Sequence, residues 1–245
     1  LSMPRAPISE AFRALRTNIQ FAAVDREIRN VLVTSPSPTE GKTTISINLA
    51  VVLAQSGKRV ALIDADLRRP KLHKRLGLPN RAGLSSLFVQ SHMYLDGSLQ
   101  KTETPNLRAI TSGDLPPNPA ELLASEKMST IMNSVHEHVD LIVIDSPPIM
   151  AVTDAAVLAP KVDGVVLVVR PGGTKISALE SCVEQMRRVG ANILGVVIND
   201  IELGNSRFSY NYYYRGYYTY YDYYGDSEQK PRPGRRKSER SSSKV

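Results

Sequence analysis

Short apolar runs that end in polar or acidic residues recur along the chain and constrain its fold most strongly. Most of them are apolar throughout rather than alternating; they span residues 31–35, 60–64, 107–111, 141–145, 165–170 and 194–199. Strands of a parallel sheet have this pattern, because helices cover both of their faces. Helical patterns lie between the runs, at 42–55, 126–138 and 175–189. The sequence therefore predicts an α/β fold with a mostly parallel sheet flanked by helices.

Composition divides the 245 residues into four parts. Residues 1–29 form an amphipathic opening, and residues 30–203 carry the α/β pattern. Residues 204–226 are rich in tyrosine and are expected to be flexible, and residues 227–245 are basic, almost free of aliphatic side chains and expected to be disordered. Ten of the eleven tyrosines lie in the third part: Tyr210, Tyr212, Tyr213, Tyr214, Tyr217, Tyr218, Tyr220, Tyr221, Tyr223 and Tyr224.

The opening segment predicts a helix with Ser9 as its N-cap after Pro7. The apolar stripe of this helix consists of Ile8, Phe12, Leu15, Ile19 and Ala22. Glu10, Arg13 and Arg16 are expected to project away from that stripe, toward solvent or a partner. An ion pair between residues three apart on a solvated face is the simpler alternative for these charges.

Charge argues against a nucleic-acid partner. The chain carries +7, but seven basic residues against one acid between 230 and 245 account for +6 of it, which leaves residues 1–229 near +1. The single cysteine, Cys182, cannot form an internal disulfide, and no run of 18 apolar residues occurs. Because the sequence begins with Leu1, we expect it to be cut from a longer chain, which leaves room for a membrane segment upstream.

A phosphate-binding loop is predicted between the first apolar run and the helix that follows it. Residues 36–44 read Pro-Ser-Pro-Thr-Glu-Gly-Lys-Thr-Thr. Backbone N–H groups from Gly41 to Thr44 would face a β-phosphate, Lys42 would reach the β and γ oxygens, and Thr43 would offer its hydroxyl to Mg²⁺. Pro36 replaces the first glycine of the usual motif, so the turn must be made differently.

Three aspartates follow apolar strands. Asp64 ends the run at 60–64 and Asp66 follows two residues later, and Asp145 ends the run at 141–145. The carboxyl ends of parallel strands share one edge with the phosphate loop, so these carboxylates can converge on one Mg²⁺ and its waters. A single aspartate in such a position more often caps a turn or helix; three of them with Lys42 and Thr43 favour the site.

With these motifs, the sequence resembles the bacterial tyrosine kinases, the Walker-motif autokinases of capsule and exopolysaccharide export. The matches are Gly41-Lys42-Thr43, Asp64-Ala-Asp66 with Leu67-Arg68-Arg69-Pro70, Asp145-Ser-Pro-Pro, Pro116 to Leu123, the Glu10-x-x-Arg13-x-x-Arg16 helix and the tyrosine cluster. The MinD and ParA type ATPases share this deviant Walker fold but carry a signature lysine where this chain has Ser37. A MinD/ParA-like ATPase without kinase activity is therefore the alternative.

The resemblance implies a P-loop kinase that binds ATP and Mg²⁺ and phosphorylates its own tyrosine cluster between subunits. Lys42, Asp64, Asp66 and Asp145 would be catalytic; Thr43 and the three aspartates would hold the metal. Nucleotide contacts are expected from Glu40, Gly41, Lys42, Thr43 and Thr44, and from Asn199 and Arg170, although both of the last two suit ordinary turns and loops.

The family also implies partners and a location. Glu10, Arg13 and Arg16 would assemble a homo-oligomeric ring. A transmembrane polysaccharide copolymerase, fused upstream or separate, would activate the kinase, and a tyrosine phosphatase would reverse its action. The chain is accordingly expected on the cytoplasmic side of the bacterial plasma membrane, regulating polysaccharide polymerisation and export.

Overall fold

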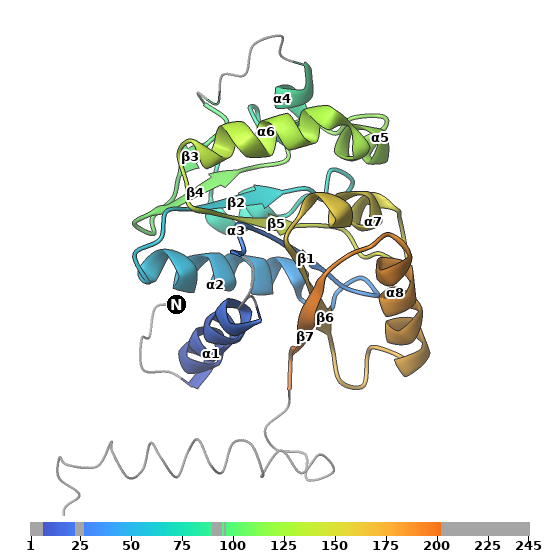
Figure 1. Cartoon of the computed structure of the whole chain (residues 1–245). Coiled ribbons are helices and arrows are strands. Elements are labelled where there is room, and N and C mark those ends of the chain that lie inside the picture. Colours follow the sequence, from blue (N-terminus) through green and yellow to red (C-terminus); the bar gives the residue numbers. More distant parts are fainter. Residues whose placement is uncertain (1–6, 23–26, 90–94, 96, 202–245) are drawn as a thin grey trace, which may run out of the picture. The chain divides into compact units, whose positions relative to one another are not determined.

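The protein, described here from a computed structural model, contains one seven-stranded sheet between two layers of helices (Figure 1). The structure describes residues 7–22, 27–89, 95 and 97–201, and the ten tyrosines of the cluster lie outside these ranges. The strands are β1 (Asn30–Thr34), β2 (Val60–Asp64), β3 (Gln100–Lys101), β4 (Leu107–Ile110), β5 (Leu141–Asp145), β6 (Gly164–Val169) and β7 (Ile193–Ile198). The helices are α1 (Pro7–Phe21), α2 (Lys42–Gln55), α3 (Leu72–Leu76), α4 (Leu84–Val89), α5 (Pro119–Ala124), α6 (Glu126–His136), α7 (Asp154–Leu158), the 3₁₀ turn η1 (Ala159–Lys161) and α8 (Ile176–Arg188).

The sheet order is β3-β4-β2-β5-β1-β6-β7, and every neighbouring pair is parallel except β3 with β4. The predicted mostly parallel sheet is thus confirmed. The order places β2, β5 and β1 side by side, although these strands are far apart in the sequence. Their carboxyl ends therefore bring the three segments with predicted site residues to one edge of the sheet.

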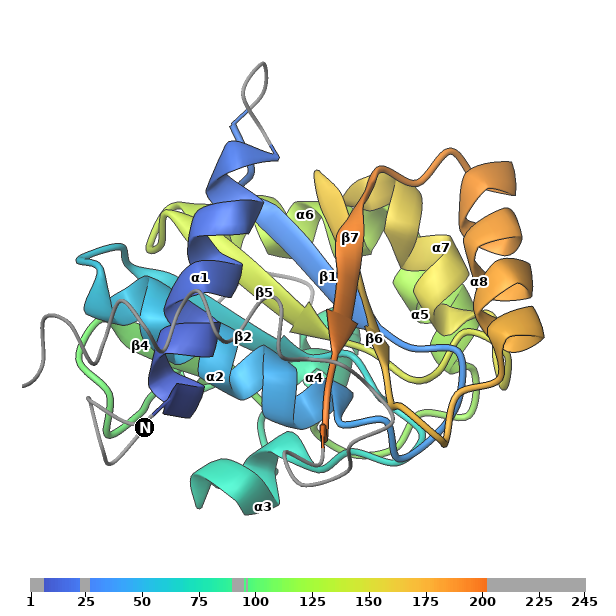
Figure 2. The ribbon, with the colours of Figure 1, turned by 90° about the horizontal axis from the view of Figure 1, so that it is seen from below.

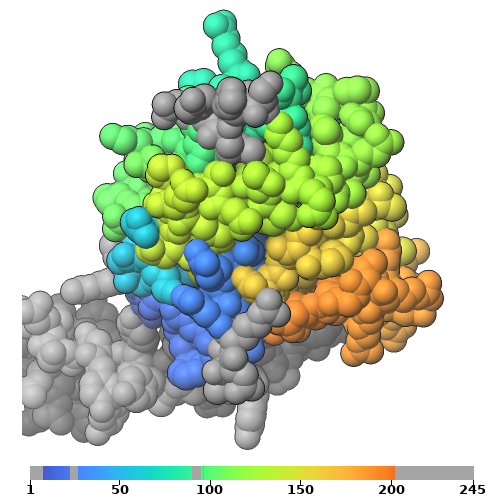
Figure 3. Space-filling model, turned by 45° about the horizontal axis from the view of Figure 1, so that its top comes forward, coloured from blue at the N-terminus to red at the C-terminus, as the bar shows by residue number. Residues whose placement is uncertain are grey.

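Two cores fill the space between the sheet and the helices. On one face, α4 to α8 pack through residues such as Leu87, Leu123, Met128 and Cys182. The space-filling view shows the green and yellow-green residues of α5 and α6 as a continuous layer on this side (Figure 3). On the other face, α1, α2 and α3 pack through residues such as Leu49. Strands covered on both faces explain why their sequences are apolar throughout.

The opening helix packs on α2, as the views along two directions show (Figures 1 and 2). Two details differ from the sequence prediction. The helix begins at Pro7, a residue favoured in the first turn, so Ser9 is a buried residue inside the helix rather than its N-cap. Ile8 is 61% exposed and does not join the packed stripe, whereas Phe12 and Ile19 are buried.

The three charged residues of α1 do not all project outward. Glu10 and Arg13 form the ion pair expected for residues three apart. Arg16, however, donates from a terminal guanidinium nitrogen to the backbone oxygen of Val52 in α2, at 3.2 Å. The prediction that Arg16 projects away from the packing face is therefore wrong, because a long arginine side chain can lie back along the neighbouring helix. None of the described helices is long and apolar enough to span a bilayer.

Candidate active site

The loop between β1 and α2 has the geometry of a phosphate-binding loop. Gly41 precedes α2 with φ 95° and ψ 17°, in the left-handed region, and Thr39 also has a positive φ of 65°. A Cβ atom on Gly41 would lie 2.0 Å from Nδ2 of Asn199, so space as well as conformation requires glycine here. The N-terminus of the long helix α2 then presents its first N–H groups toward a ligand.

The side chain of Glu40 links the loop to itself and to the segment after β6. Its buried carboxylate accepts a hydrogen bond from the backbone N–H of Ser37 at 2.8 Å and another from the hydroxyl of Thr174. The backbone oxygen of Pro36 accepts from the N–H of Met150, which braces the loop from the segment after β5. Glu40 therefore supports the loop from within, which suggests a scaffold role for its side chain rather than direct contact with a nucleotide.

Asp64 and Asp145 lie directly beside each other at the ends of β2 and β5, where they are paired in register. Both are buried, with exposures of 0% and 2%. Asp64 accepts hydrogen bonds from the backbone N–H groups of Asp66 at 3.2 Å and Leu72 at 3.1 Å. Asp145 accepts from the hydroxyl of Ser46 in α2 at 3.0 Å. The expected convergence of strand-end carboxylates on the phosphate loop is present for this pair.

The two carboxylates destabilise each other's ionised form. Burial, and then the charge of Asp145, raise the pKa of Asp64 well above its ordinary value. Burial also raises the pKa of Asp145 to about 6, although hydrogen bonds from Thr43 and Ser46 and the charge of Lys42 oppose this shift. Two neighbouring buried carboxylates with only partial compensation are suited to receive a cation or a proton.

Lys42, the first residue of α2, carries a positive charge that acts on Asp145. It is only 8% exposed. Burial lowers its pKa, while the charges of Asp145, Asp66 and Glu40 raise it and that of Lys71 lowers it. These electrostatic couplings place the phosphate loop, both aspartate segments and the start of α3 in one site.

Comparison with known proteins supports this geometry. A family model described as AAA domain matches residues 39–195. The putative tyrosine-protein kinase CapB of Staphylococcus aureus is 41% identical over 211 residues, which cover 86% of this chain and 92% of that protein. The kinase domain of the Escherichia coli tyrosine kinase ETK is 36% identical with a TM-score of 0.76, over 83% of this chain and 80% of that one. The chain belongs to the bacterial tyrosine kinases.

The ATPase alternative is less favoured for this kinase. The septum site-determining protein MinD from Pyrococcus horikoshii, a structure complexed with Mg-ADP, is 24% identical with a TM-score of 0.59, over 73% of this chain and 72% of that one. At that identity the likeness establishes the shared fold alone. The predicted MinD-like P-loop fold is confirmed, while the closer sequence likeness is to kinases.

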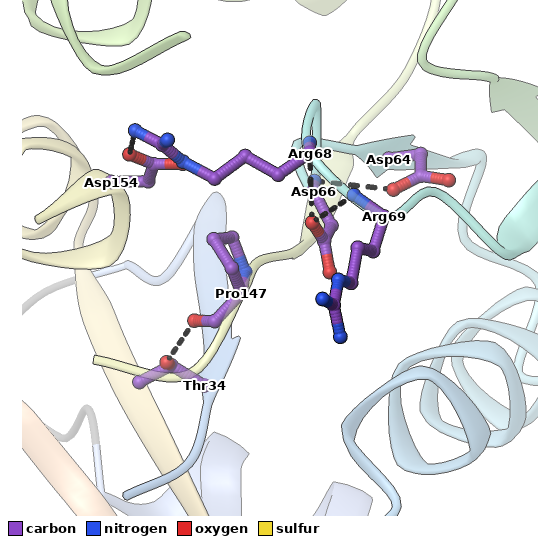
Figure 4. A network of polar contacts seen from close by, with 7 residues as sticks. All are labelled: Thr34, Asp64, Asp66, Arg68, Arg69, Pro147 and Asp154. Carbon is purple, nitrogen blue, oxygen red and sulfur yellow. Dashed lines mark hydrogen bonds and ion pairs between the residues drawn. The ribbon is translucent and has the colours of Figure 1, made fainter. Parts of the chain in front are cut away.

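Asp66 and Arg68 organise the loop that follows β2. The Asp66 carboxylate accepts from the backbone N–H groups of Arg68 at 3.3 Å and Arg69 at 2.9 Å, which closes a tight turn. The Arg68 side chain then reaches Asp154 at the start of α7, with two bonds of 2.8 and 2.9 Å (Figure 4). Asp154 is fully buried. The sequence prediction missed this partner, since an aspartate in the first turn of a short helix is common and carries no signal of a distant contact.

Asn199 and Arg170 lie beside the phosphate loop, and both have protein partners. The Asn199 amide donates to the backbone oxygen of Glu40 at 2.9 Å. The guanidinium of Arg170 pairs with Asp200 at 2.6 Å. Their predicted contacts with a nucleotide stay predictions. The exposed hydroxyl-bearing residue Thr44 and the half-buried Thr43 occupy the first turn of α2, as the motif requires.

The donor set of the site suits Mg²⁺, which prefers oxygen ligands and keeps several waters. Among the described residues, no three His, Cys, Asp or Glu side chains are grouped closely enough to hold an ion unaided. The undercompensated pair of buried carboxylates beside the Thr43 hydroxyl nevertheless fits such an ion, with phosphate oxygens and water completing its shell. Thr43, Asp64, Asp66 and Asp145 are the residues that would hold it.

Proposed function

We propose that this kinase transfers the γ-phosphoryl group of ATP, with Mg²⁺, to tyrosines between residues 210 and 224 of a second copy of the chain. The observation that supports this most is the register pairing of Asp64 with Asp145 at the edge of the sheet where α2 begins. It joins carboxylates with raised pKa to a phosphate loop, which is the combination that phosphoryl transfer to a hydroxyl requires.

Each side chain has a separate task in this proposal. Lys42 binds the β and γ oxygens, and the N–H groups at the start of α2 bind the remaining phosphate charge. Mg²⁺, when bound, would neutralise charge on the transferred group. Asp64 accepts the proton of the tyrosine hydroxyl, because its raised pKa suits a general base. Asp66 and Asp145 hold the water ligands of the metal.

The reach of the segment after residue 201 supports transfer between copies. From residue 201 to residue 217 the chain can extend about 53 Å, or about 20–24 Å as a flexible coil. A neighbouring site in a homo-oligomeric ring is within that range. Glu10 and Arg13 on α1, together with the part of Arg16 that remains exposed, are the proposed ring contact.

A membrane partner is proposed from the length of the relatives. The chain spans 28% of the Escherichia coli tyrosine-protein kinase etk and 30% of the putative kinase EpsB of Ralstonia solanacearum. We assign the activating role to a transmembrane polysaccharide copolymerase and the reversal to a tyrosine phosphatase. The kinase would then act at the cytoplasmic face of the membrane and regulate polysaccharide polymerisation and export.

A mixing experiment tests transfer between copies. One chain carries Lys42→Met with its tyrosines intact, and the other is active but has the ten clustered tyrosines replaced by phenylalanine. After incubation with Mg²⁺ and γ-labelled ATP, mass spectrometry should find label on Tyr210 to Tyr224 of the Lys42→Met chain. Lys42→Met alone should show transfer reduced on the order of a hundredfold or more.

Two other outcomes would contradict the proposal. Label on wild type but none on the mixed Lys42→Met chain would mean transfer within one copy. Free phosphate without protein label, from a wild-type chain supplied with Mg²⁺ and its activator, would support the ATPase alternative.

A further inference from the structure

The segment that follows β6 contacts the phosphate loop through one hydroxyl, that of Thr174. This residue lies outside all the predicted motifs and is half-buried between exposed neighbours. Its hydroxyl accepts a hydrogen bond from the backbone N–H of Arg170 at 2.8 Å and donates one to the carboxylate of Glu40. Because β6 lies between β1 and β7 in the sheet and is parallel to both, the segments after these three strands meet at one edge. Thr174 therefore reaches the loop from 134 positions further along the chain.

The partners of the Thr174 hydroxyl fix the direction of its single proton. The backbone N–H of Arg170 can only donate, so it occupies a lone pair of the hydroxyl oxygen. The ionised carboxylate of Glu40 can only accept, so the proton points toward it. The backbone N–H groups of Gly173 and Thr174 both donate to the backbone oxygen of Arg170, at 3.1 and 2.8 Å, and close a tight turn. The turn thus presents a fixed hydrogen-bond donor to Glu40.

The carboxylate of Glu40 connects this donor to the backbone of the phosphate loop. One of its oxygens accepts from Thr174, and the other accepts from the N–H of Ser37 at 2.8 Å. The backbone oxygen of Ser37 is held as well, since it accepts from the hydroxyl of Ser35 at 2.7 Å. Glu40 is buried and forms no ion pair with any residue that the structure describes. Its charge therefore depends on these donors and on the longer-range attraction of Lys42.

The loop needs such support because its backbone is strained on one side of Glu40 and left-handed on both. Thr39 has a φ of 65°, which is unfavourable for a residue with a branched side chain. Gly41 follows with a φ of 95°. Strained conformations of this kind persist where surrounding contacts determine them. The amide of Asn199 supplies one such contact to the backbone oxygen of Glu40 at 2.9 Å, and Thr174 supplies the other to its side chain.

We propose that Thr174 is a positioning residue for the phosphate loop. Through Glu40 it holds the loop in the conformation in which the N–H groups from Gly41 to Thr44 bind the phosphates of the nucleotide. This inference deepens the proposed function and rests on it for the identity of that nucleotide. Without the hydroxyl, the nucleotide itself would have to order the loop, and that ordering lowers affinity. Since the bound substrate and the transition state lose the same support, KM for ATP rises while kcat is kept.

Kinetics of the mixed reaction test the positioning role. Thr174→Val, which removes the hydroxyl but keeps the shape of the side chain, is placed in the active chain that lacks the clustered tyrosines. It should raise KM for ATP about fivefold to twentyfold and leave kcat within about threefold of the parent. Thr174→Ser keeps the hydroxyl and should stay within about twofold of the parent in both constants.

Thr102→Val is the matched control. The Thr102 hydroxyl is also half-buried in a turn, where it accepts from the N–H of Thr104 at 3.2 Å and donates to the backbone oxygen of Leu107 at 2.9 Å. Leu107 begins β4, so this turn lies at the opposite edge of the sheet from the site. The control should change neither constant. An unchanged KM in Thr174→Val, an equal rise in the control, or equal rises in Thr174→Val and Thr174→Ser would overturn the proposal.

A double substitution tests whether Thr174 acts through Glu40. Glu40→Ala removes the carboxylate and should raise KM for ATP at least as much as Thr174→Val does. Adding Thr174→Val to Glu40→Ala should then change KM by less than about twofold, because the partner of the hydroxyl is already absent. If the two increases multiply, Thr174 acts by another route and the proposal is wrong.

Binding of ADP separates this inference from the proposed transfer to tyrosine. Fluorescent ADP is titrated, with Mg²⁺, against the full chain carrying each single substitution, and no phosphoryl transfer is needed. Its Kd should rise about fivefold to twentyfold in Thr174→Val and stay near that of the parent in Thr174→Ser and Thr102→Val. This pattern supports the positioning role even if no tyrosine is labelled. Equal Kd values for the parent and Thr174→Val would overturn it even if the tyrosines are labelled normally.

Discussion

Two groups of buried carboxylates at the same edge of the sheet differ in how their charge is balanced. Asp154 is fully buried and receives two hydrogen bonds from Arg68. Asp64 and Asp145 are equally buried and adjacent, but the negative charge of Asp145 acts on Asp64, and neither forms an ion pair with an arginine among the residues that the structure describes. Asp154 is thus a structural charge, whereas the Asp64–Asp145 pair is left available to a ligand.

The contrast shows which buried carboxylates of this fold are not fully compensated by positive charge. Burying an unpaired charge costs several kcal/mol, so folds normally supply a partner or shift the pKa. Here a hydrogen-bonded arginine neutralises Asp154 at α7, whereas Lys42 at the start of α2 compensates the Asp64–Asp145 pair only in part. Incomplete compensation of this kind is typical of sites where further positive charge arrives with the substrate or metal.

The largest expected effect tests whether the Asp64–Asp145 pair is catalytic. Asp145→Asn should reduce the rate of tyrosine phosphorylation on the order of a hundredfold or more, because the ionised oxygen that faces Lys42 and Thr43 is lost. Asp140→Asn is the matched control, since Asp140 immediately precedes the same strand at its opposite end and pairs with Arg59. If the rate of label incorporation falls equally in both variants, Asp145 has no specific role in catalysis.

The second largest effect is expected in the pH dependence of stability, which should differ between Asp145 and Asp154. The pKa of Asp145, about 6, lies above that of an unfolded aspartate, so the folded chain binds the proton more tightly. Its contribution to stability is complete below about pH 4 and is lost as pH rises through about 6. Without nucleotide, Asp145→Asn should therefore raise the free energy of unfolding at pH 7.5 by at most about 3 kcal/mol. This corresponds to a rise in Tm of roughly 6–10 °C. At pH 4 the Tm should be nearly unchanged.

Asp154→Asn is the counterpart in that experiment. It removes the partner of Arg68, so it should lower Tm at pH 7.5 rather than raise it. Thermal unfolding of both variants at the two pH values measures the difference. Shifts of the same sign at pH 7.5 would mean that the two groups are balanced alike.

Arg68→Met removes the other partner of the Arg68–Asp154 ion pair. It leaves Asp154 buried without its cation, which should cost about 2–3 kcal/mol of unfolding free energy. That is below the usual cost for a fully buried pair, because Arg68 is itself 40% exposed. Denaturant titration measures the loss, and adding Asp154→Asn to the same chain should recover part of it. No recovery would show that Arg68 acts through packing alone.

The sequence predicts the fold well where local patterns are strong. The bounds of β2, β5 and α2 agree with the predicted ranges, since an apolar run that ends in aspartate, or a glycine before a long apolar helix, marks them clearly. The sequence analysis does not predict the short elements β3, α3, α4, α5, α7 and η1. Segments of two to six residues contain too few positions for a hydrophobic period to emerge.

The site is predictable only to the extent that topology is. Asp64 and Asp145 could be brought together because parallel strands end at a common edge. The pairing of Arg68 with Asp154, and the contact of Asn199 with the loop at Gly41, join residues that are far apart in sequence and carry no periodic signal. Only coordinates reveal which aspartate has an arginine and which does not.

The smallest expected effect concerns the hydroxyl of Ser46, which compensates part of the charge of Asp145. Ser46 is fully buried and lies 3.0 Å from both the Asp145 carboxylate and the backbone oxygen of Lys42, and its one proton can serve only one of them at a time. Ser46→Ala removes a hydrogen bond that favours the ionised carboxylate, so the pKa of Asp145 should rise further. The acid limb of the pH–rate profile should move upward by about 0.5 unit.

Thr34→Val is the control for that shift. Thr34 is also fully buried near the site, but its hydroxyl donates to the backbone oxygen of Pro147 at 2.9 Å and touches no carboxylate (Figure 4). Its loss should lower stability by about 1 kcal/mol without moving the profile. A displaced acid limb in both variants would trace the effect to general loosening of the edge. A shift in Ser46→Ala alone would show that hydroxyls, rather than an arginine, tune the carboxylate that must stay available.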